Sequence, residues 1–320
     1  MKTLYIIGNG FDIAHGLDTS YWSFRTFLDN HYPDYLYQFE ELYNITHIDE
    51  SDPRITEEDR NRFYSSINIV LWREFEEKMG KPNISEMLDY SQSILGELNL
   101  DGGNIGIKDT MDEYWRSQYG FIRKFQEYVL EWVESIDTTN VLPKRNTLIG
   151  SNSLFLNFNY TDVLERIYKI ENVLHIHGGV TSVSDIPPIM GHCNSIDIEQ
   201  HTNWSYEAAD EYNEGESSIH SAIANYLKSI FKNTNSIIAI NKAFWNSLSD
   251  VNKVVIIGWS AGKADLPYLY KTRDNISKGS EWTVYYYNTT AKNNLEKAMK
   301  ESGIEESFIV RYEESDQFWD

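Results

Sequence analysis

Short apolar runs recur along the chain, and most of them end at glycine, asparagine or histidine instead of alternating with polar residues. Strands that are buried on both faces have this pattern, and such strands are typical of a parallel sheet covered by helices. The expected strands are residues 4–7, 154–156, 173–176, 254–257, 283–287 and 308–312. The pattern therefore predicts an α/β fold with a mostly parallel sheet and helices on both of its faces.

A long helical segment separates the first expected strand from the second. Apolar residues recur there at spacings of three, four and seven, which is the periodicity of a buried helix face. The expected helices are residues 21–43, 57–79, 85–98 and 111–136, with a turn at Asp101–Asn104 and a linker at Leu142–Arg145. The sequence thus predicts a sheet-containing core, residues 1–20 and 146–320, and a large helical insert, residues 21–145. A second insert, about 195–250, is expected to begin irregular and to become helical from Ser217.

Charge and composition narrow the classes of partner. Lys and Arg number 28 against 49 Asp and Glu, which gives a formal net charge of −21. Long-range repulsion of a phosphate backbone makes nucleic acid an unlikely partner, although a local basic cleft at Lys144, Arg145 and Arg166 stays an alternative. A single cysteine, Cys193, excludes a four-cysteine zinc site. No signal core and no membrane-length apolar run is found, so we expect a cytoplasmic protein that uses neither membrane nor metal.

The first segment with candidate chemistry is Gly8-Asn9-Gly10-Phe11-Asp12, which directly follows an expected strand. Glycines at a strand-to-helix turn let backbone amides approach phosphates, and the following helix N-terminus adds positive potential. The ordinary dinucleotide-binding pattern would place a third glycine at position 13, where this chain has Ile13. The alternative is a tight turn that needs glycine only for its backbone conformation.

Two further segments place polar side chains after strands. Asn159 follows the strand at 154–156, and His177 follows the run that ends at Ile176. Ligands of α/β sheets bind at the carboxyl ends of strands, so both residues are candidates for a site there. Thr161 and Asp162 lie two and three positions after Asn159. Either of them is able to serve as a helix cap, without a role in a site. An imidazole titrates near neutral pH and suits a general base, whereas His175 is expected to be structural and His192 stays open.

A fourth segment, Gly258-Trp259-Ser260-Ala261-Gly262, again joins a strand to a helix. It matches the G-x-S-x-G pattern of a serine-hydrolase elbow, which makes that class a competitor. The last histidine, His220, precedes Ser260, and an elbow makes no use of the segment at Gly8. Asp265 is expected to cap the following helix, with Pro267 in its first turn.

These segments together resemble the Sir2 family of NAD-dependent proteins, whose sheet is Rossmann-like. Gly8, Gly10, Phe11, Asp12, Gly16 and Leu17 match the spacing of that family's first motif, and Phe24 and Arg25 resemble its F-R pair. The resemblance implies that Asn159 positions water and ribose and that His177 acts as general base. It leaves open whether Thr161 or Asp162 takes the place of the family's aspartate. It implies nucleotide contacts from the following residues: Gly8, Asn9, Gly10, Phe11, Asp12, Phe24, Arg25, Gly258, Ser260 and Asn288.

The amino-acid sequences of residues 7–12, 157–162, 175–178 and 258–268 are similar to those of the AbiH family of bacterial phage abortive-infection proteins. Together the two resemblances imply an antiphage protein that hydrolyses NAD to ADP-ribose and nicotinamide. The alternatives are a non-catalytic sensor of NAD or ADP-ribose and a nuclease-type toxin. An antiphage role also implies further partners: a trigger from the phage or the host, and other copies of the chain in a homo-oligomer.

Overall fold

The structure is a computed structural model, which describes residues 2–49, 51–98, 107–144 and 153–320. Two parts of the sequence prediction lie outside the described residues: the turn expected at residues 101–104, and Arg145 of the expected linker and basic cleft.

The strands are β1 (Thr3–Ile7), β2 (Ser153–Asn157), β3 (Val173–His175), β4 (Lys253–Ile257), β5 (Glu281–Tyr286) and β6 (Ile309–Glu314). The helices up to β2 are α1 (Gly10–Ala14), α2 (Tyr21–His31), α3 (Pro33–Glu41), α4 (Glu57–Val70), α5 (Phe75–Lys78), α6 (Ile84–Leu98), α7 (Ile107–Tyr119) and α8 (Phe125–Glu134). Those that follow are α9 (Val163–Tyr168), α10 (Ser195–Asp210), α11 (Glu214–Ser229), α12 (Thr234–Ile240), α13 (Lys242–Asn246), α14 (Leu266–Asn275), α15 (Thr289–Glu301), α16 (Ile304–Ser307) and α17 (Ser315–Trp319). Short 3-10 turns are η1 (Trp72–Glu74), η3 (Gly120–Lys124) and η4 (Lys263–Asp265).

The chain forms two compact units, and each is built from separate stretches of sequence. The sheet unit consists of Met1–Phe24, Val129–Ile189 and Asn233–Asp320. The helical unit consists of Arg25–Tyr128 and Met190–Lys232. Residues 190–232 thus belong with the long helical insert and not with the sheet.

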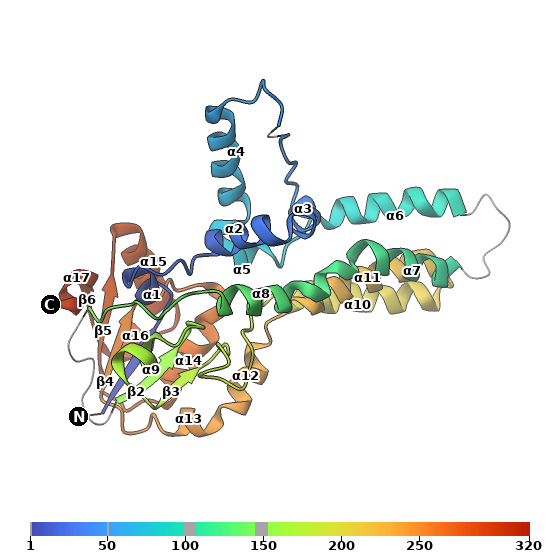
Figure 1. Cartoon of the computed structure of the whole chain (residues 1–320). Helices are drawn as coiled ribbons and strands as arrows, with labels where there is room; N and C mark the ends of the chain where they lie inside the picture. The colour runs from blue at the N-terminus through green and yellow to red at the C-terminus, as the bar shows by residue number, and fades with distance from the viewer. Residues whose placement is uncertain (1, 50, 99–106, 145–152) are drawn as a thin grey trace. The chain divides into compact units, whose positions relative to one another are not determined.

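The sheet has six parallel strands in the order β3-β2-β1-β4-β5-β6 (Figure 1). β1 lies at the centre, where Ile7 is in register with Asn157 of β2 and with Ile257 of β4. This is the Rossmann order, in which the direction of winding reverses between β1 and β4, and ligands of such sheets bind outside the strand ends at that point. The predicted α/β fold with a parallel sheet is confirmed.

Both faces of the sheet are buried, as the continuous apolar runs indicate. Leu4 and Ile6 belong to one core cluster, which includes residues of α13, α14 and α15. Ile7 and Ile257 belong to the cluster on the other face, which includes residues of α1, α9 and α17. Successive side chains of a strand point to opposite faces. A strand that is covered on both faces is therefore apolar at nearly every position, which produces the continuous runs seen in the sequence. All six expected strands lie within two residues of the observed bounds.

Three helices that the periodicity predicts as continuous are interrupted. The segment 21–43 breaks at Tyr32, and α3 starts at Pro33 because proline lacks the N–H that a helix interior needs. The segment 57–79 leaves the helix at Leu71, whose φ is −128°. The segment 111–136 passes through η3, which begins at Gly120, a residue of low helix propensity.

The expectation that the second insert is irregular before Ser217 is wrong, because α10 already begins at Ser195. The side chain of Asn194 accepts a hydrogen bond from the backbone N–H of Asp197 and caps the helix. α10 packs along α11, and the Nδ1 atoms of the buried residues His201 and His220 lie 2.9 Å apart. Because part of this contact is polar, α10 lacks the strong apolar stripe by which a helix is found in sequence.

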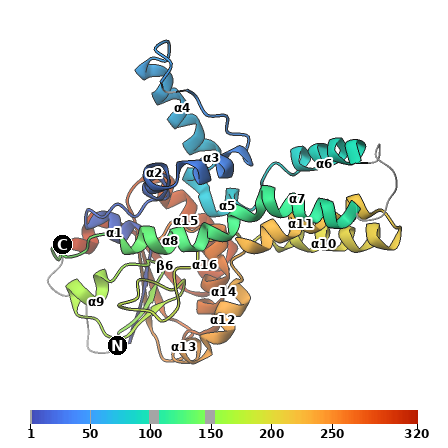
Figure 2. The same cartoon turned by 45° about the vertical axis from the view of Figure 1, so that its right-hand side comes forward.

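In the helical unit, α7, α10 and α11 lie side by side, with α11 in contact with both of the others (Figures 1 and 2). α6 also packs on α11. Across the described ranges, no helix is both long enough and apolar enough to cross a bilayer.

Candidate functional site

The loops that follow β1 and β4 meet at the switch point of the sheet, backbone against backbone. The N–H of Gly8 donates to the carbonyl of Ile257 at 3.0 Å, and the N–H of Gly10 donates to the carbonyl of Gly258 at 2.8 Å. A Cβ on Gly10 would lie 2.8 Å from the Cα of Gly258, and one on Gly8 would overlap the backbone of Trp259. The glycines at positions 8, 10 and 258 therefore let the two loops pack together, and two of their amides are occupied within the protein.

Asp12 anchors a buried polar cluster beside this loop pair. It lies in α1, is 1% exposed, and accepts a hydrogen bond from the Nδ2 of Asn159 at 2.9 Å and from the hydroxyl of Thr161 at 2.6 Å. Burial raises the pKa of Asp12 to about 7, although both hydrogen bonds act to lower it. The neighbouring Asp162 accepts instead from Thr138 at 2.7 Å. Of the two residues that the sequence left open, Thr161 is the one that lies beside Asn159.

Asn159 has one satisfied end and one unsatisfied end. Its Nδ2 donates to Asp12, and its backbone N–H donates to the Oδ1 of Asn157 at 3.1 Å. Its own Oδ1 is buried and has no hydrogen-bond partner in the described part of the chain. An unpaired buried acceptor costs about 1–3 kcal/mol, so this oxygen is a specific place for a donor from a ligand or water.

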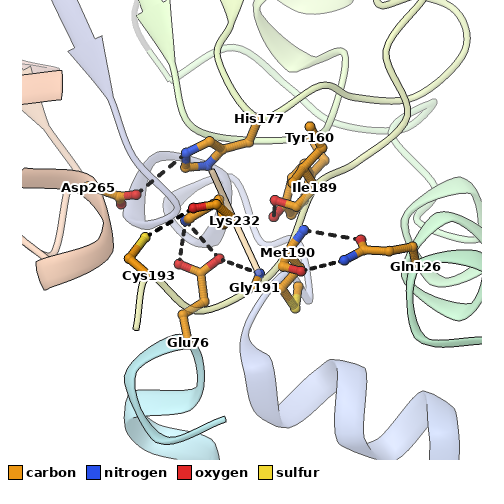
Figure 3. Close-up of polar contacts among 10 residues, drawn as sticks. All are labelled: Glu76, Gln126, Tyr160, His177, Ile189, Met190, Gly191, Cys193, Lys232 and Asp265. Carbon is orange, nitrogen blue, oxygen red and sulfur yellow. Dashed lines mark hydrogen bonds and ion pairs between the residues drawn. The ribbon is translucent and has the colours of Figure 1, made fainter. Parts of the chain in front are cut away.

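The two histidines after β2 have different surroundings. His175 has an acceptor at each ring nitrogen, the carbonyl of Asn159 at 3.0 Å and Glu165 at 2.8 Å, so it is held inside the protein. His177 is 4% exposed, and its Nε2 lies 3.5 Å from Oδ1 of Asp265 (Figure 3). Asp265 stands at the N-cap position of α14 but makes no side-chain cap. The expected helix cap is instead a carboxylate facing an imidazole.

Aromatic rings surround His177. Phe158 packs edge-on to its imidazole with ring centroids 5.3 Å apart, and Tyr268 lies at the same distance on a tilted plane. Trp259 lies 6.2 Å from Phe158, and its indole Nε1 is buried without a hydrogen-bond partner among the described residues. Residues that follow β2, β3 and β4 thus build one polar and aromatic cluster at the carboxyl edge of the sheet.

Several residues that the resemblance assigns to the nucleotide have other roles here. Phe11 is fully buried and packs against His15 and Trp319, with centroids at 4.6 and 5.4 Å. Phe24 is fully buried against Trp132 at 5.1 Å. The side chain of the exposed residue Asn9 donates to the carbonyl of Thr19 at 2.8 Å and closes the loop after α1.

Arg25 belongs to the helical unit, where its guanidinium is held by Glu40. Nε and Nη2 donate to the two carboxylate oxygens at 2.8 and 3.2 Å, and both side chains are buried. Trp72 and His47 contact the same carboxylate. The F-R pair of the sequence is therefore split, since Phe24 lies in the core of one unit and Arg25 forms an ion pair in the other.

The remaining nucleotide candidates, Ser260 and Asn288, are exposed. Asn288 caps α15, because its Oδ1 accepts from the N–H of Ala291 at 2.8 Å. Ser260 follows β4 in the strand-to-helix setting of an elbow, but the positive φ values fall on Gly258 and Ala261, at 70° and 58°. The backbone strain of an elbow is thus not centred on the serine.

A second polar cluster, in the helical unit, has no signal in the sequence. Lys232 is fully buried, and its Nζ lies 2.9 and 2.8 Å from the two carboxylate oxygens of Glu76 (Figure 3). Gly191 donates its N–H to the same carboxylate at 3.3 Å. His192, which the sequence left open, is buried and bonded to the carbonyl of Leu227 and to Asn194, and burial lowers its pKa to about 4. His192 is therefore a neutral structural residue.

In residues 2–49, 51–98, 107–144 and 153–320, no three His, Cys, Asp or Glu side chains are grouped so that they could hold a metal ion.

The comparison with protein families gives a clear result. The model of a family described as bacteriophage abortive infection AbiH matches residues 4–286. The chain belongs to the AbiH family. The AbiH match runs from β1 to the end of β5 and includes Asp12, Asn159, His177 and Asp265, whereas Asn288 lies beyond it. Membership places the chain among bacteriophage abortive-infection proteins. Searches of curated proteins and of solved structures found no match.

Proposed function

We propose that the chain acts in abortive infection by hydrolysing NAD to ADP-ribose and nicotinamide at the carboxyl edge of the sheet, with the pair Asp12 and Asn159 and the pair His177 and Asp265. The observation that carries this proposal is the buried, unpartnered Oδ1 of Asn159 at the carboxyl edge of a sheet with Rossmann order. The resemblance to the Sir2 family supplies the substrate class and the roles of Asn159 and His177, and the contacts of these side chains are compatible with those roles.

Asn159 orients the attacking water. Its NH₂ group is fixed by Asp12, so its carbonyl oxygen is the end that faces away from that carboxyl group. A carbonyl oxygen accepts a hydrogen bond from water or from a ribose hydroxyl, which places the oxygen of the water for attack. Thr161 strengthens this arrangement because its hydroxyl donates to the other oxygen of Asp12.

His177 receives the proton. Water adds to the anomeric carbon of the nicotinamide ribose, the C–N glycosidic bond breaks, and its electron pair leaves with nicotinamide, which becomes neutral. The proton lost by the water goes to His177, and Asp265 stabilises the imidazolium. The surrounding rings of Phe158 and Tyr268 exclude bulk water, which strengthens this ion pair.

The diphosphate is not held by the amides of Gly8 and Gly10, because both donate within the protein. In the proposed complex these glycines shape the crevice at the switch point, and their contribution to binding is steric.

The experiment is incubation of the purified full-length chain with NAD, followed by chromatography of nicotinamide and ADP-ribose. Asn159→Ala and His177→Ala are expected to lower turnover at least 100-fold, and Asp265→Asn about 10-fold. Asn140→Ala and His31→Ala, which change exposed residues of the same types, are the matched controls and keep full turnover. Ser260→Ala also keeps it, whereas its loss of activity would favour the serine-hydrolase class.

Absence of turnover above background in the wild type, with phage lysate added as a source of trigger, would contradict hydrolysis. In that case, thermal stabilisation by NAD that Asn159→Ala abolishes would identify a sensor.

A further inference from the structure

A surface pocket of about 240 Å³ lies in the helical unit, where α7 and η3 face α11. Its cause is local. Apart from Tyr226, the residues of α11 that line it are small or polar, and they recur at helical spacing along one face: Ser218, Ser221, Ala222, Asn225 and Ser229. Opposite them, the regular turns of α7 end at Tyr119, and Gly120 contributes no side chain. The small residues and the glycine leave the gap open between the larger side chains.

The aromatic part of the lining contains an unused hydrogen-bond donor. Trp115 stacks on Tyr119 with centroids 5.6 Å apart and an interplanar angle of 5°. Trp115 is 2% exposed, and its Nε1 has no hydrogen-bond partner in the part of the chain that the structure describes. A buried N–H without an acceptor is rare in native proteins, and it indicates that a ligand atom or water supplies the acceptor.

The pocket is also lined by two arginines, in a chain with a net charge of −21. Arg116 lies in α7 and Arg123 in η3, and both line the pocket. Arg116 pairs with Glu113. Arg123 makes no ion pair with a carboxylate of the described residues, so its guanidinium is available to an anion.

The acidic residue of the lining does not cancel this charge. Asp112 accepts the hydroxyl hydrogen bond of Ser218, and Lys108 lies 3.5 Å from its other oxygen. The negative group of the pocket is therefore balanced inside the protein, and the surplus charge is positive.

We propose that this pocket binds a small phosphorylated molecule, of the size of a sugar phosphate or a mononucleotide. Arg123 and Arg116 hold the phosphate, because guanidinium groups bind its oxygens in a bidentate manner. The N–H of Trp115 donates to an acceptor of the ligand, and the hydroxyl of Ser221 supplies a further hydrogen bond, whereas Ser218 and Ser229 donate within the protein. This site is separate in sequence and in unit from the cluster proposed to hydrolyse NAD, and the inference does not depend on that activity.

The experiment is isothermal titration of the full-length chain with AMP, ribose 5-phosphate and adenosine. The wild type is expected to bind the two phosphorylated probes and not adenosine. Arg123→Gln removes the available cation at an exposed position, and Ala222→Leu fills the pocket without changing charge. Each is expected to weaken binding at least 10-fold, and Trp115→Phe, which keeps a ring but removes the donor, several-fold.

Two controls separate this site from others. Arg62→Gln makes the same charge change on an exposed side chain of α4 outside the pocket and is expected to bind like wild type. Lys292→Gln, which removes a charge on α15 of the sheet unit, should do so as well. The proposal is overturned if neither phosphorylated probe binds, if adenosine binds as tightly as AMP, or if Arg123→Gln and Ala222→Leu bind like wild type.

Discussion

The side-chain amide of Asn159 donates a 2.9 Å hydrogen bond to the carboxyl group of Asp12, although 147 positions separate the two residues in sequence. The bond joins the helix after β1 to the loop after β2, and these strands are neighbours in the sheet. Because the bond fixes one end of the amide, it determines which atom of Asn159 is left for a ligand. The candidate site therefore depends on a residue, Asp12, that need not touch substrate at all.

Thr161→Val removes the hydroxyl that donates to Asp12 while keeping the shape of the side chain. We expect the free energy of unfolding to fall by about 1–3 kcal/mol, because a buried carboxyl oxygen loses its donor. Urea unfolding at pH 8 measures this change. Thr138→Val, whose partner Asp162 is less buried, is the control and should lose less. Equal losses in both variants would contradict the special position of Asp12.

The pH dependence of stability should contain a contribution from Asp12. Its pKa is raised from 3.8 to about 7, so between about pH 4 and pH 7 the folded state holds a proton that the unfolded state has lost. The stability contributed by this proton is fully present below about pH 4 and is lost as the pH rises through about 7, with a total of about 4 kcal/mol. Asp12→Asn cannot titrate, so its stability should fall less than that of the wild type between pH 5 and pH 8. Parallel pH profiles of the two proteins would refute this.

Gly258→Ala tests the contact between the two glycine loops. The new Cβ would overlap the backbone N of Phe11, and the residue has a φ of +70°. Gly279→Ala is matched in conformation, with a φ of +85°, but its Cβ would meet open space. We expect a loss of about 1–2 kcal/mol at Gly279 from backbone strain alone and at least about 2 kcal/mol more at Gly258. Thermal unfolding of both variants measures the difference, and similar losses would show that the loops can separate at little cost.

Arg25→Ala should destabilise the helical unit, because it leaves the buried carboxylate of Glu40 without its main partner. The expected loss is about 3–5 kcal/mol, whereas Arg62→Ala, in an exposed ion pair, should lose less than about 1 kcal/mol. Chemical unfolding followed by tryptophan fluorescence distinguishes the two. If Arg25→Ala is as stable as the wild type but binds NAD more weakly, the result would favour the nucleotide contact that the resemblance implies for Arg25 over a purely structural ion pair.

The sequence was informative wherever burial leaves a local pattern. The central strands β1 and β4 are readable because each is apolar on both faces, and the polar candidates follow strands at the carboxyl edge of the sheet. The order of the strands is not local, and no pattern in β1 shows that β2 and β4 will flank it. The same limit applies to the turn that contains Gly8 and Gly10. Its glycines predict backbone N–H groups that are free to bind a ligand. Their partners lie at Ile257 and Gly258, about 250 positions further along the chain.

Other differences arise because tertiary contacts select among local options. Thr161 and Asp162 are both able to cap a helix, and only the position of Asp12 decides that Thr161 joins Asn159 at the Asp12 carboxyl group. The pairing of His177 with Asp265 joins two segments that the sequence treats as separate motifs. The pair Lys232 and Glu76 leaves no pattern at all, because neither residue type is expected in a core.

The central place of β1 has a consequence for biosynthesis. In a growing chain, Thr3–Ile7 is made well before either neighbour of this strand, at Ser153–Asn157 and Lys253–Ile257. Until β4 has been made, the first strand keeps an unpaired edge, and such long-range pairing slows folding. A product that ends before β4 would lack the carbonyls of Ile257 and Gly258, to which Gly8 and Gly10 donate, so the loop pair would form only after this strand has joined the sheet.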